Sequence, residues 1–274
     1  MARAPGALIR RPRSYAELSA EGALLAGGGR ALLLQLAHPS VARGVAEHSR
    51  FAEDPLKRLW GTLEYLYVLA FGSEEETRLV ARYVGGAHRG VRGDGYDARD
   101  PDLQLWVAAT LYDTTVQVAE AVHGPLPDAL ADELYREDAR IGTALGMPAE
   151  LWPADRAAFA VYWREQLALL EVTPVARGLA TALLRPESGP LWMRALMPLA
   201  RLLTAGLLPE PIRSGYGVRW TPELERRFTR TFRAVLAVYR VLPGPVRRAP
   251  SHLLLRRFRA RTGGAAAGRV GRRT

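Results

Sequence analysis

The sequence predicts an all-α fold in one large domain, and three observations support this prediction. Residues that favour helix N-caps recur along the chain, several of them followed by proline or, three positions later, by glutamate. Alternating polar and apolar runs typical of strands do not recur. Short segments with glycine and proline separate the helical runs, and none is long enough to require a second domain.

Five helix starts carry explicit capping signals. Two are capping boxes, in which each side chain bonds the other residue's backbone N–H: Ser14 with Glu17, and Ser73 with Glu76. Three others place an N-cap residue before proline at the first helical position: Asp54-Pro55, Asp100-Pro101 and Thr221-Pro222. With the apolar periodicity these starts predict helices, in chain order, near residues 14–26, 30–37, 39–48, 55–70, 73–88, 101–122, 127–145, 153–171, 174–184, 190–207 and 222–241.

Glycine and proline are expected to form the links between these helices. The linking segments are residues 27–29, 90–95, 124–125, 186–190 and 243–245. We expect a basic arm at 1–13, one folded body at 14–255 and an Arg-rich, disordered tail at 256–274.

The net charge of +10 is concentrated in the two arms. Residues 1–13 hold four arginines and residues 256–274 hold seven, with no acid in either. Without these eleven arginines the body has a net charge of −1, so we expect no nucleic-acid partner for the body. A helical module that binds a membrane surface or nucleic acid through the arms remains one alternative. The absence of cysteine excludes disulfides, iron–sulfur clusters and thiolate-ligated haem.

Neither a signal peptide nor a transmembrane segment is evident in the sequence. Charged residues interrupt the apolar run that follows the first arginines. The most apolar stretch, residues 190–208, contains two arginines and a proline, which suits a core helix or a membrane-surface helix better than a span. We expect a cytoplasmic protein, with peripheral membrane contact left open.

Arg58 and Thr62 are the first candidate site residues. They lie one turn apart in the helix predicted at 55–70, which is apolar on nearly every face. If Arg58 is buried, it requires an anionic partner from the protein or from a cofactor. As Arg58 lies in the first turn, its side chain can also extend to water.

His88 is the second candidate, because five glycines surround it between residues 85 and 95. Glycine allows the backbone to approach a flat ligand closely, and a neutral imidazole is the usual haem ligand in a chain without cysteine. Arg89 and Arg92 are placed to meet haem propionates. The alternative is an ordinary helix C-terminus with a histidine in its last turn.

Two further positions have both a functional and a structural interpretation. His38, which follows an apolar run and precedes proline, is either a distal acid/base or second ligand, or a helix-end histidine hydrogen-bonded to a backbone carbonyl. Asp113 and Thr114 lie in the middle of the helix at 101–122, where they either line a pocket or bond back to the preceding turn.

A set of motifs between residues 35 and 107 resembles a known family. Its elements are Gln35 to Val45, His48-Ser49, Phe51, Asp54-Pro55, Arg58 with Thr62, Phe71-Gly72, His88, Val91, Gly93, Tyr96, Ala98, Asp100-Pro101, Leu103 and Trp106-Val107. Their order and spacing together resemble the catalytic domain shared by latex-clearing protein, a rubber oxygenase, and the endoplasmic-reticulum oxygenase of mycophenolic acid biosynthesis. The similarity spans about residues 14–245.

The resemblance implies a globin-like helical core that holds one haem b, and oxidative chemistry with O2. It implies His88 as the iron ligand, with Arg58 and Thr62 beside the haem as binding and catalytic residues. Arg89, Arg92 and Trp106 are the further expected haem contacts, and His38 is the expected distal catalytic group.

Two departures from rubber oxygenase separate this chain from that enzyme. Gly61 stands where rubber oxygenase has a distal lysine, and the catalytic glutamate has no clear counterpart, although Glu47 or His38 lies in that region. We therefore expect a haem oxygenase, using O2 or peroxide and an unknown electron donor, for a small apolar alkene-like or lipid-like substrate. A haem protein without oxygenase activity is the second alternative.

Overall fold

The computed structural model describes residues 10–48, 55–186 and 190–270, with side chains for 10–48, 60–186 and 190–262. The described chain is almost entirely helical. Its elements, in order, are α1 (Tyr15–Ser19), η1 (Gly22–Gly27), α2 (Gly28–Ala37), α3 (Pro39–His48), α4 (Pro55–Phe71), α5 (Glu74–His88), β1 (Arg92–Gly93), β2 (Tyr96–Asp97), α6 (Pro101–His123), α7 (Asp128–Asp138), α8 (Arg140–Thr143), η2 (Ala149–Leu151), α9 (Arg156–Leu169), α10 (Pro174–Leu184), α11 (Leu191–Leu207), α12 (Glu210–Gly215), α13 (Pro222–Val241) and α14 (Gly244–Val270). The prediction of an all-α fold is confirmed.

Most of the predicted caps are confirmed. Ser73 and Glu76 form the complete capping box of α5. Asp100 and Thr221 each accept a hydrogen bond from a backbone N–H in the first turn of their helices. Ser14 also caps its helix, but Glu17 accepts from the backbone N–H of Arg13, so that box is incomplete. Asp54 lies outside the described residues.

The helix predicted at 14–26 is wrong, because Glu21 interrupts it. The backbone of Glu21 is extended, and its buried carboxylate accepts hydrogen bonds from the hydroxyl of Tyr239 at 2.5 Å and from Arg247 at 2.9 Å. The chain therefore forms α1 and then the 3₁₀ helix η1 in place of one helix. The helix predicted at 127–145 is also divided, into α7 and α8. The short helix α12 was not predicted.

The prediction of a link at residues 27–29 is also wrong, since these glycines belong to η1 and α2. A Cβ at Gly27 would lie 2.4 Å from Cγ2 of Thr114, and one at Gly29 would lie 2.2 Å from Oγ1 of Thr204. The glycines therefore allow this segment to approach α6 and α11 closely.

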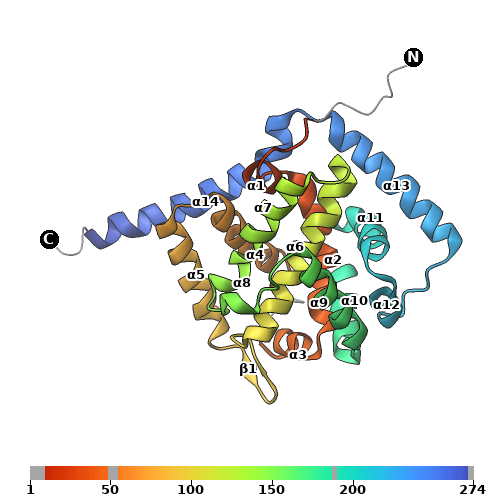
Figure 1. Ribbon diagram of the computed structural model, residues 1–274, viewed down its shortest axis with the longest axis horizontal. Coiled ribbons are helices and arrows are strands. Elements are labelled where there is room, and N and C mark those ends of the chain that lie inside the picture. The colour runs from red at the N-terminus through yellow and green to blue at the C-terminus, as the bar shows by residue number, and fades with distance from the viewer. Residues whose placement is uncertain (1–9, 49–54, 187–189, 271–274) are drawn as a thin grey trace.

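The helix α6 runs through the middle of the molecule, with η1 and α2 packed along it (Figure 1). The largest apolar cluster lies between α4, α6, α7 and α9. Four aromatic side chains form its centre, with edge-to-face contacts from Tyr112 to the other three: Tyr135, Trp152 and Phe159. A second cluster joins α2 to α10 and α12.

A carboxyl group lies inside the larger cluster. Asp138, the last residue of α7, is 4% exposed, and its carboxyl group lies near the hydroxyl of Tyr15. Burial, assisted by the nearby charge of Glu137, raises the pKa of Asp138 to about 7. The group is therefore largely neutral in mildly acidic solution.

The C-terminal helix α14 extends the folded body beyond residue 255, the limit that the sequence predicted. Phe258 is 3% exposed within the larger cluster. Arg259 and Arg261 form ion pairs with Glu76 of α5 and Glu64 of α4. The predicted tail therefore contributes at least residues 256–262 to the body.

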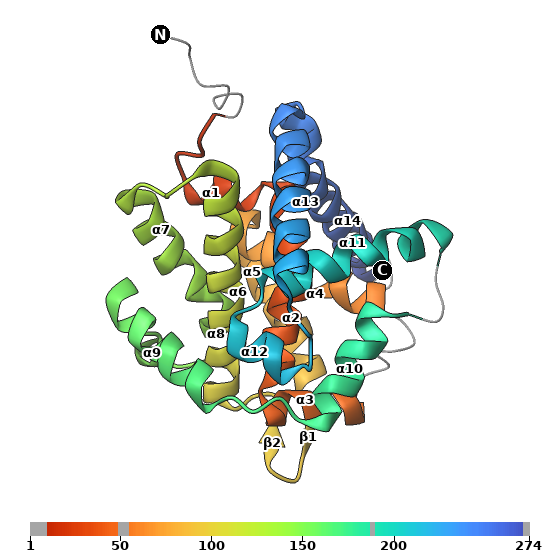
Figure 2. The same cartoon turned by 90° about the vertical axis from the view of Figure 1, so that its right-hand side faces the viewer.

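Among the described residues, no single helix has both the length and the apolar composition of a membrane span. The pair α9 and α10 passes the same test together, although 104° separates the directions of the two helices. Figure 2 shows α9 on one side of the molecule and α11 extending on the opposite side.

Candidate functional site

Two of the main candidates lie near the free ends of the helical hairpin that α4 and α5 form. Arg58 stands 13 residues before the end of α4, and His88 stands 14 residues after the start of α5. At about 1.5 Å per residue both positions lie about 20 Å from the turn between the helices. The helices α4 and α5 contact each other, and both residues lie at the ends of these helices that are distant from the connecting turn. The side chain of Arg58 lies outside the described residues.

Small residues leave open space at this end of the hairpin. Among the described residues, a Cβ at Gly61 of α4 or Gly85 of α5 would meet no atom within 4 Å, and one at Gly86 would meet the guanidinium of Arg89 at 3.4 Å. Thr62 is exposed and His88 is half-buried. The arrangement leaves room for a flat group to lie close to the backbone beside an imidazole.

The β-hairpin that follows His88 joins the end of α5 to α3. The backbone N–H of Val91 donates to the carbonyl of His88 at 2.9 Å. A Cβ at Gly44 of α3 would lie 3.4 Å from the side chains of Val91 and Tyr96, so α3 packs closely on the hairpin. This contact fixes the position of the last turn of α5 relative to α3.

A polar network completes the junction between the hairpin and α3. The hydroxyl of Tyr96 donates to Glu47 at 2.6 Å, and Nε2 of His48 lies 2.8 Å from the same hydroxyl. The hydrogen bond to Glu47 raises the pKa of Tyr96 to about 12. The sequence suggested Glu47 only as a stand-in for a catalytic glutamate, and the partnership with Tyr96 was missed because the two residues are 49 positions apart.

His38 occupies the C-cap of α2 and is half-buried. Its Nδ1 accepts a hydrogen bond from the backbone N–H of Ser40 at 3.3 Å. Burial lowers the pKa of His38, against the opposing charge of Asp100, and so favours the neutral ring. This geometry suits the structural interpretation, while the catalytic one remains a prediction.

The other expected cofactor contacts lie in different surroundings. Arg89 and Arg92 are exposed next to His88 at the end of α5 and in β1. Trp106 is 1% exposed and stacks on Trp163 of α9, with ring centroids 5.4 Å apart. The structure therefore groups the two arginines with His88 and places Trp106 within the core.

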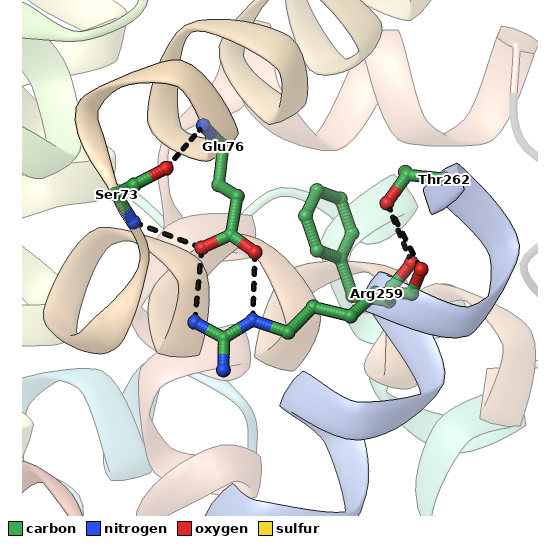
Figure 3. A network of polar contacts seen from close by, with 5 residues as sticks. Ser73, Glu76, Arg259 and Thr262 are labelled. Atoms are coloured by element: carbon green, nitrogen blue, oxygen red, sulfur yellow. Dashed lines mark hydrogen bonds and ion pairs between the residues drawn. The ribbon is translucent and has the colours of Figure 1, made fainter. Parts of the chain in front are cut away.

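The start of α5 is held by the C-terminal helix (Figure 3). Glu76, the third residue of α5, accepts from the backbone N–H of Ser73 in the capping box and from Arg259 at 2.7 and 3.0 Å. The hydrogen bond from Arg259 is the main reason that the pKa of Glu76 is lowered. The helix that carries His88 is thus anchored at its other end by α14.

Asp113 and Thr114 bond across to α2 instead of back to the preceding turn. The buried guanidinium of Arg30 donates to Asp113 at 2.5 Å, to Thr114 at 2.6 Å and to the carbonyl of Leu207 at 2.8 Å. The pKa of Asp113 is nevertheless raised, because burial outweighs the effect of Arg30. This ion pair joins α2, α6 and the end of α11, and its role is structural.

Comparison with known proteins gives a consistent result. The family model described as "ER-bound oxygenase mpaB/B'/Rubber oxygenase, catalytic domain" matches residues 15–262. An uncharacterized protein of Mycobacterium bovis and one of Mycobacterium tuberculosis are each 36% identical to this chain over 227 residues, which cover 77% of this chain and 87% of each relative. No solved structure matches the chain.

Proposed function

We propose that this chain, which belongs to the family of ER-bound oxygenases mpaB/B' and rubber oxygenases, is a haem b-dependent oxygenase for a small apolar substrate. The observation that carries the proposal is the position of His88 in the last turn of α5, three residues after Gly85, where a Cβ would meet no atom of the described residues within 4 Å. From the family resemblance we also expect the helical core to be globin-like.

The residues at this end of the hairpin suit a haem. The imidazole of His88 is the donor that binds haem iron in a chain without cysteine. The uncovered glycines leave space for the flat ring, and the exposed Arg89 and Arg92 have the charge to pair with propionates. Arg58, in the first turn of α4, is a third candidate for a propionate because the family resemblance implies that it lies beside the haem.

The bound haem would supply the binding and activation of O2. The protein would hold the iron through His88 and present an apolar surface to the substrate. Trp60, which is 43% exposed and next to Gly61 in α4, is one apolar side chain available for such a surface. An alkene-like or lipid-like substrate therefore fits better than a charged one.

The first test is the absorption spectrum of the full-length protein made in haem-supplemented cells. We expect a Soret band, and we expect His88→Ala to lose most of the bound haem. His252→Ala is the matched control, because His252 is exposed on α14. A colourless wild-type protein, or full haem content in the His88 variant, would contradict the proposal.

The second test measures oxygen consumption by the haem-loaded protein with alkene-containing lipids. Consumption that depends on the lipid and is lost in the His88 variant is expected of an oxygenase. A Soret band without lipid-dependent consumption would instead identify a haem-binding protein with another activity.

A further inference from the structure

Three exposed apolar side chains gather on the first turns of α11. Leu191 is 80% exposed, Trp192 is 61% exposed and Leu196 is 53% exposed. Positions i, i+1 and i+5 of a helix fall within about 140° of its circumference, so the three side chains share one side of α11. We call them the α11 tip. A tryptophan and two leucines on one helix face form an apolar surface that a water-exposed helix rarely carries.

The second half of α11 is fixed to the body, whereas the α11 tip is not covered. Leu203 and Thr204 are buried, and a Cβ at Gly206 would lie 2.2 Å from the ring of Phe228 in α13. Figure 2 shows α11 running outward from α13 on the side opposite α7 and α9. The tip therefore projects from a rigidly held helix.

The described charged residues of α10, its C-cap and α11 are all arginines. Between Glu171 and Glu210 the sequence holds four arginines and one acid, Glu187. Of these arginines, Arg185 and Arg194 are exposed at the end of α10 and the start of α11. A second copy of the chain meeting this face would bring like charges together, which disfavours a symmetric dimer here.

We propose that the α11 tip docks the protein on the surface of an anionic lipid bilayer. Trp192 and the two leucines would enter the boundary between headgroups and acyl chains, and Arg185 and Arg194 would lie among the lipid phosphates. Leucine, tryptophan and arginine are the residues that membrane-surface helices combine in this way. The inference rests on the exposed side chains of α11 and does not depend on haem.

The test is co-sedimentation of the full-length protein with vesicles of phosphatidylcholine and phosphatidylglycerol in equal parts. We expect binding to these vesicles, little binding to phosphatidylcholine alone, and release as salt is raised. The double variant W192E/L196E should lower the vesicle affinity by about tenfold or more, because it removes two apolar anchors and adds negative charge. The variant Arg194→Gln should weaken binding by a smaller factor.

The matched control is V238E/V241E, which places two glutamates at apolar positions of α13 that are each 62% exposed. Equal losses in both double variants would overturn the proposal, since a general charge effect would then explain them. So would an absence of binding by the wild-type chain, or a wild-type dimer that W192E/L196E dissociates. Vesicle binding is measured both with and without haem. An absence of binding would overturn the docking proposal and would not affect the proposed haem chemistry.

Discussion

The buried carboxyl of Asp138 makes the stability of this protein depend on pH. Its pKa is raised from an ordinary value of 3.8 to about 7, mainly by burial. Between these two values the unfolded chain ionises Asp138 and the folded chain keeps it neutral. The stability that the neutral Asp138 provides is therefore fully present below about pH 4. It is lost as the pH rises from about 4 to about 7, and above pH 7 the group has no further effect on the free energy of unfolding.

The expected size follows from the shift. Each pH unit in this interval lowers the free energy of unfolding by about 1.4 kcal/mol. Between pH 5 and pH 8 the interval covers about two units, which gives about 3 kcal/mol. Asp138→Asn keeps the shape of the side chain and removes the ionisation, so it should gain about 3 kcal/mol relative to the wild type over the same change in pH.

The assay is urea unfolding of both proteins at pH 5 and pH 8, followed by circular dichroism. Asp94→Asn, an exposed substitution in the β-hairpin, controls for the effect of removing one carboxylate. A difference between Asp138→Asn and the wild type that is equal at the two pH values would refute the argument.

Three further predictions concern packing and charge, each checked by urea unfolding. Phe258→Ala should destabilise the protein by about 3 kcal/mol, because it empties a buried ring site in α14, and no loss would mean that this helix is not part of the body. Gly29→Ala should destabilise by about 1–3 kcal/mol since its Cβ would collide with a buried hydroxyl, whereas Gly178→Ala, with open space around it, should stabilise by about 0.5 kcal/mol. Arg30→Ala should cost about 3–5 kcal/mol because it leaves the Asp113 carboxylate without its partner, and a loss below about 1 kcal/mol would contradict the structural role of this pair.

The parts of the fold set by local chemistry could be predicted from the sequence. The bounds of α3, α10 and α13 agree with the predicted ranges 39–48, 174–184 and 222–241. Two of these helices begin with threonine followed by proline, Thr173-Pro174 and Thr221-Pro222, and the threonine caps the first turn in both. A signal of this kind needs no distant partner, so it can be recognised in the chain alone.

The parts that depend on distant partners could not be predicted. Gly27–Gly29 follow the usual pattern of a link, and only the side chains of α6 and α11 show why helix is preferred there. The start of the Arg-rich tail looked disordered because its acidic partners, Glu64 and Glu76, lie far away in the sequence.

In the candidate site, too, the features that depend on neighbouring residues could be predicted and those that depend on distant partners could not. The glycines around His88 are local in the sequence and indicate an open helix end, and the space beside Gly85 agrees with that interpretation. The stacking of Trp106 on Trp163 could not be read from the sequence, because the two residues belong to helices separated by several others.

The contacts of α13 and α14 with the N-terminal part of the chain determine when during synthesis that part can complete its folding. Arg259 reaches Glu76 across 183 positions, Tyr239 reaches Glu21 across 218, and Arg247 reaches Glu21 across 226. During synthesis, 238 residues are joined before the first of these partners, Tyr239, is added to the chain. The buried carboxylate of Glu21 and the α4–α5 hairpin therefore acquire their final contacts only when the last helices emerge, and a prematurely terminated chain would expose both to chaperones and proteases.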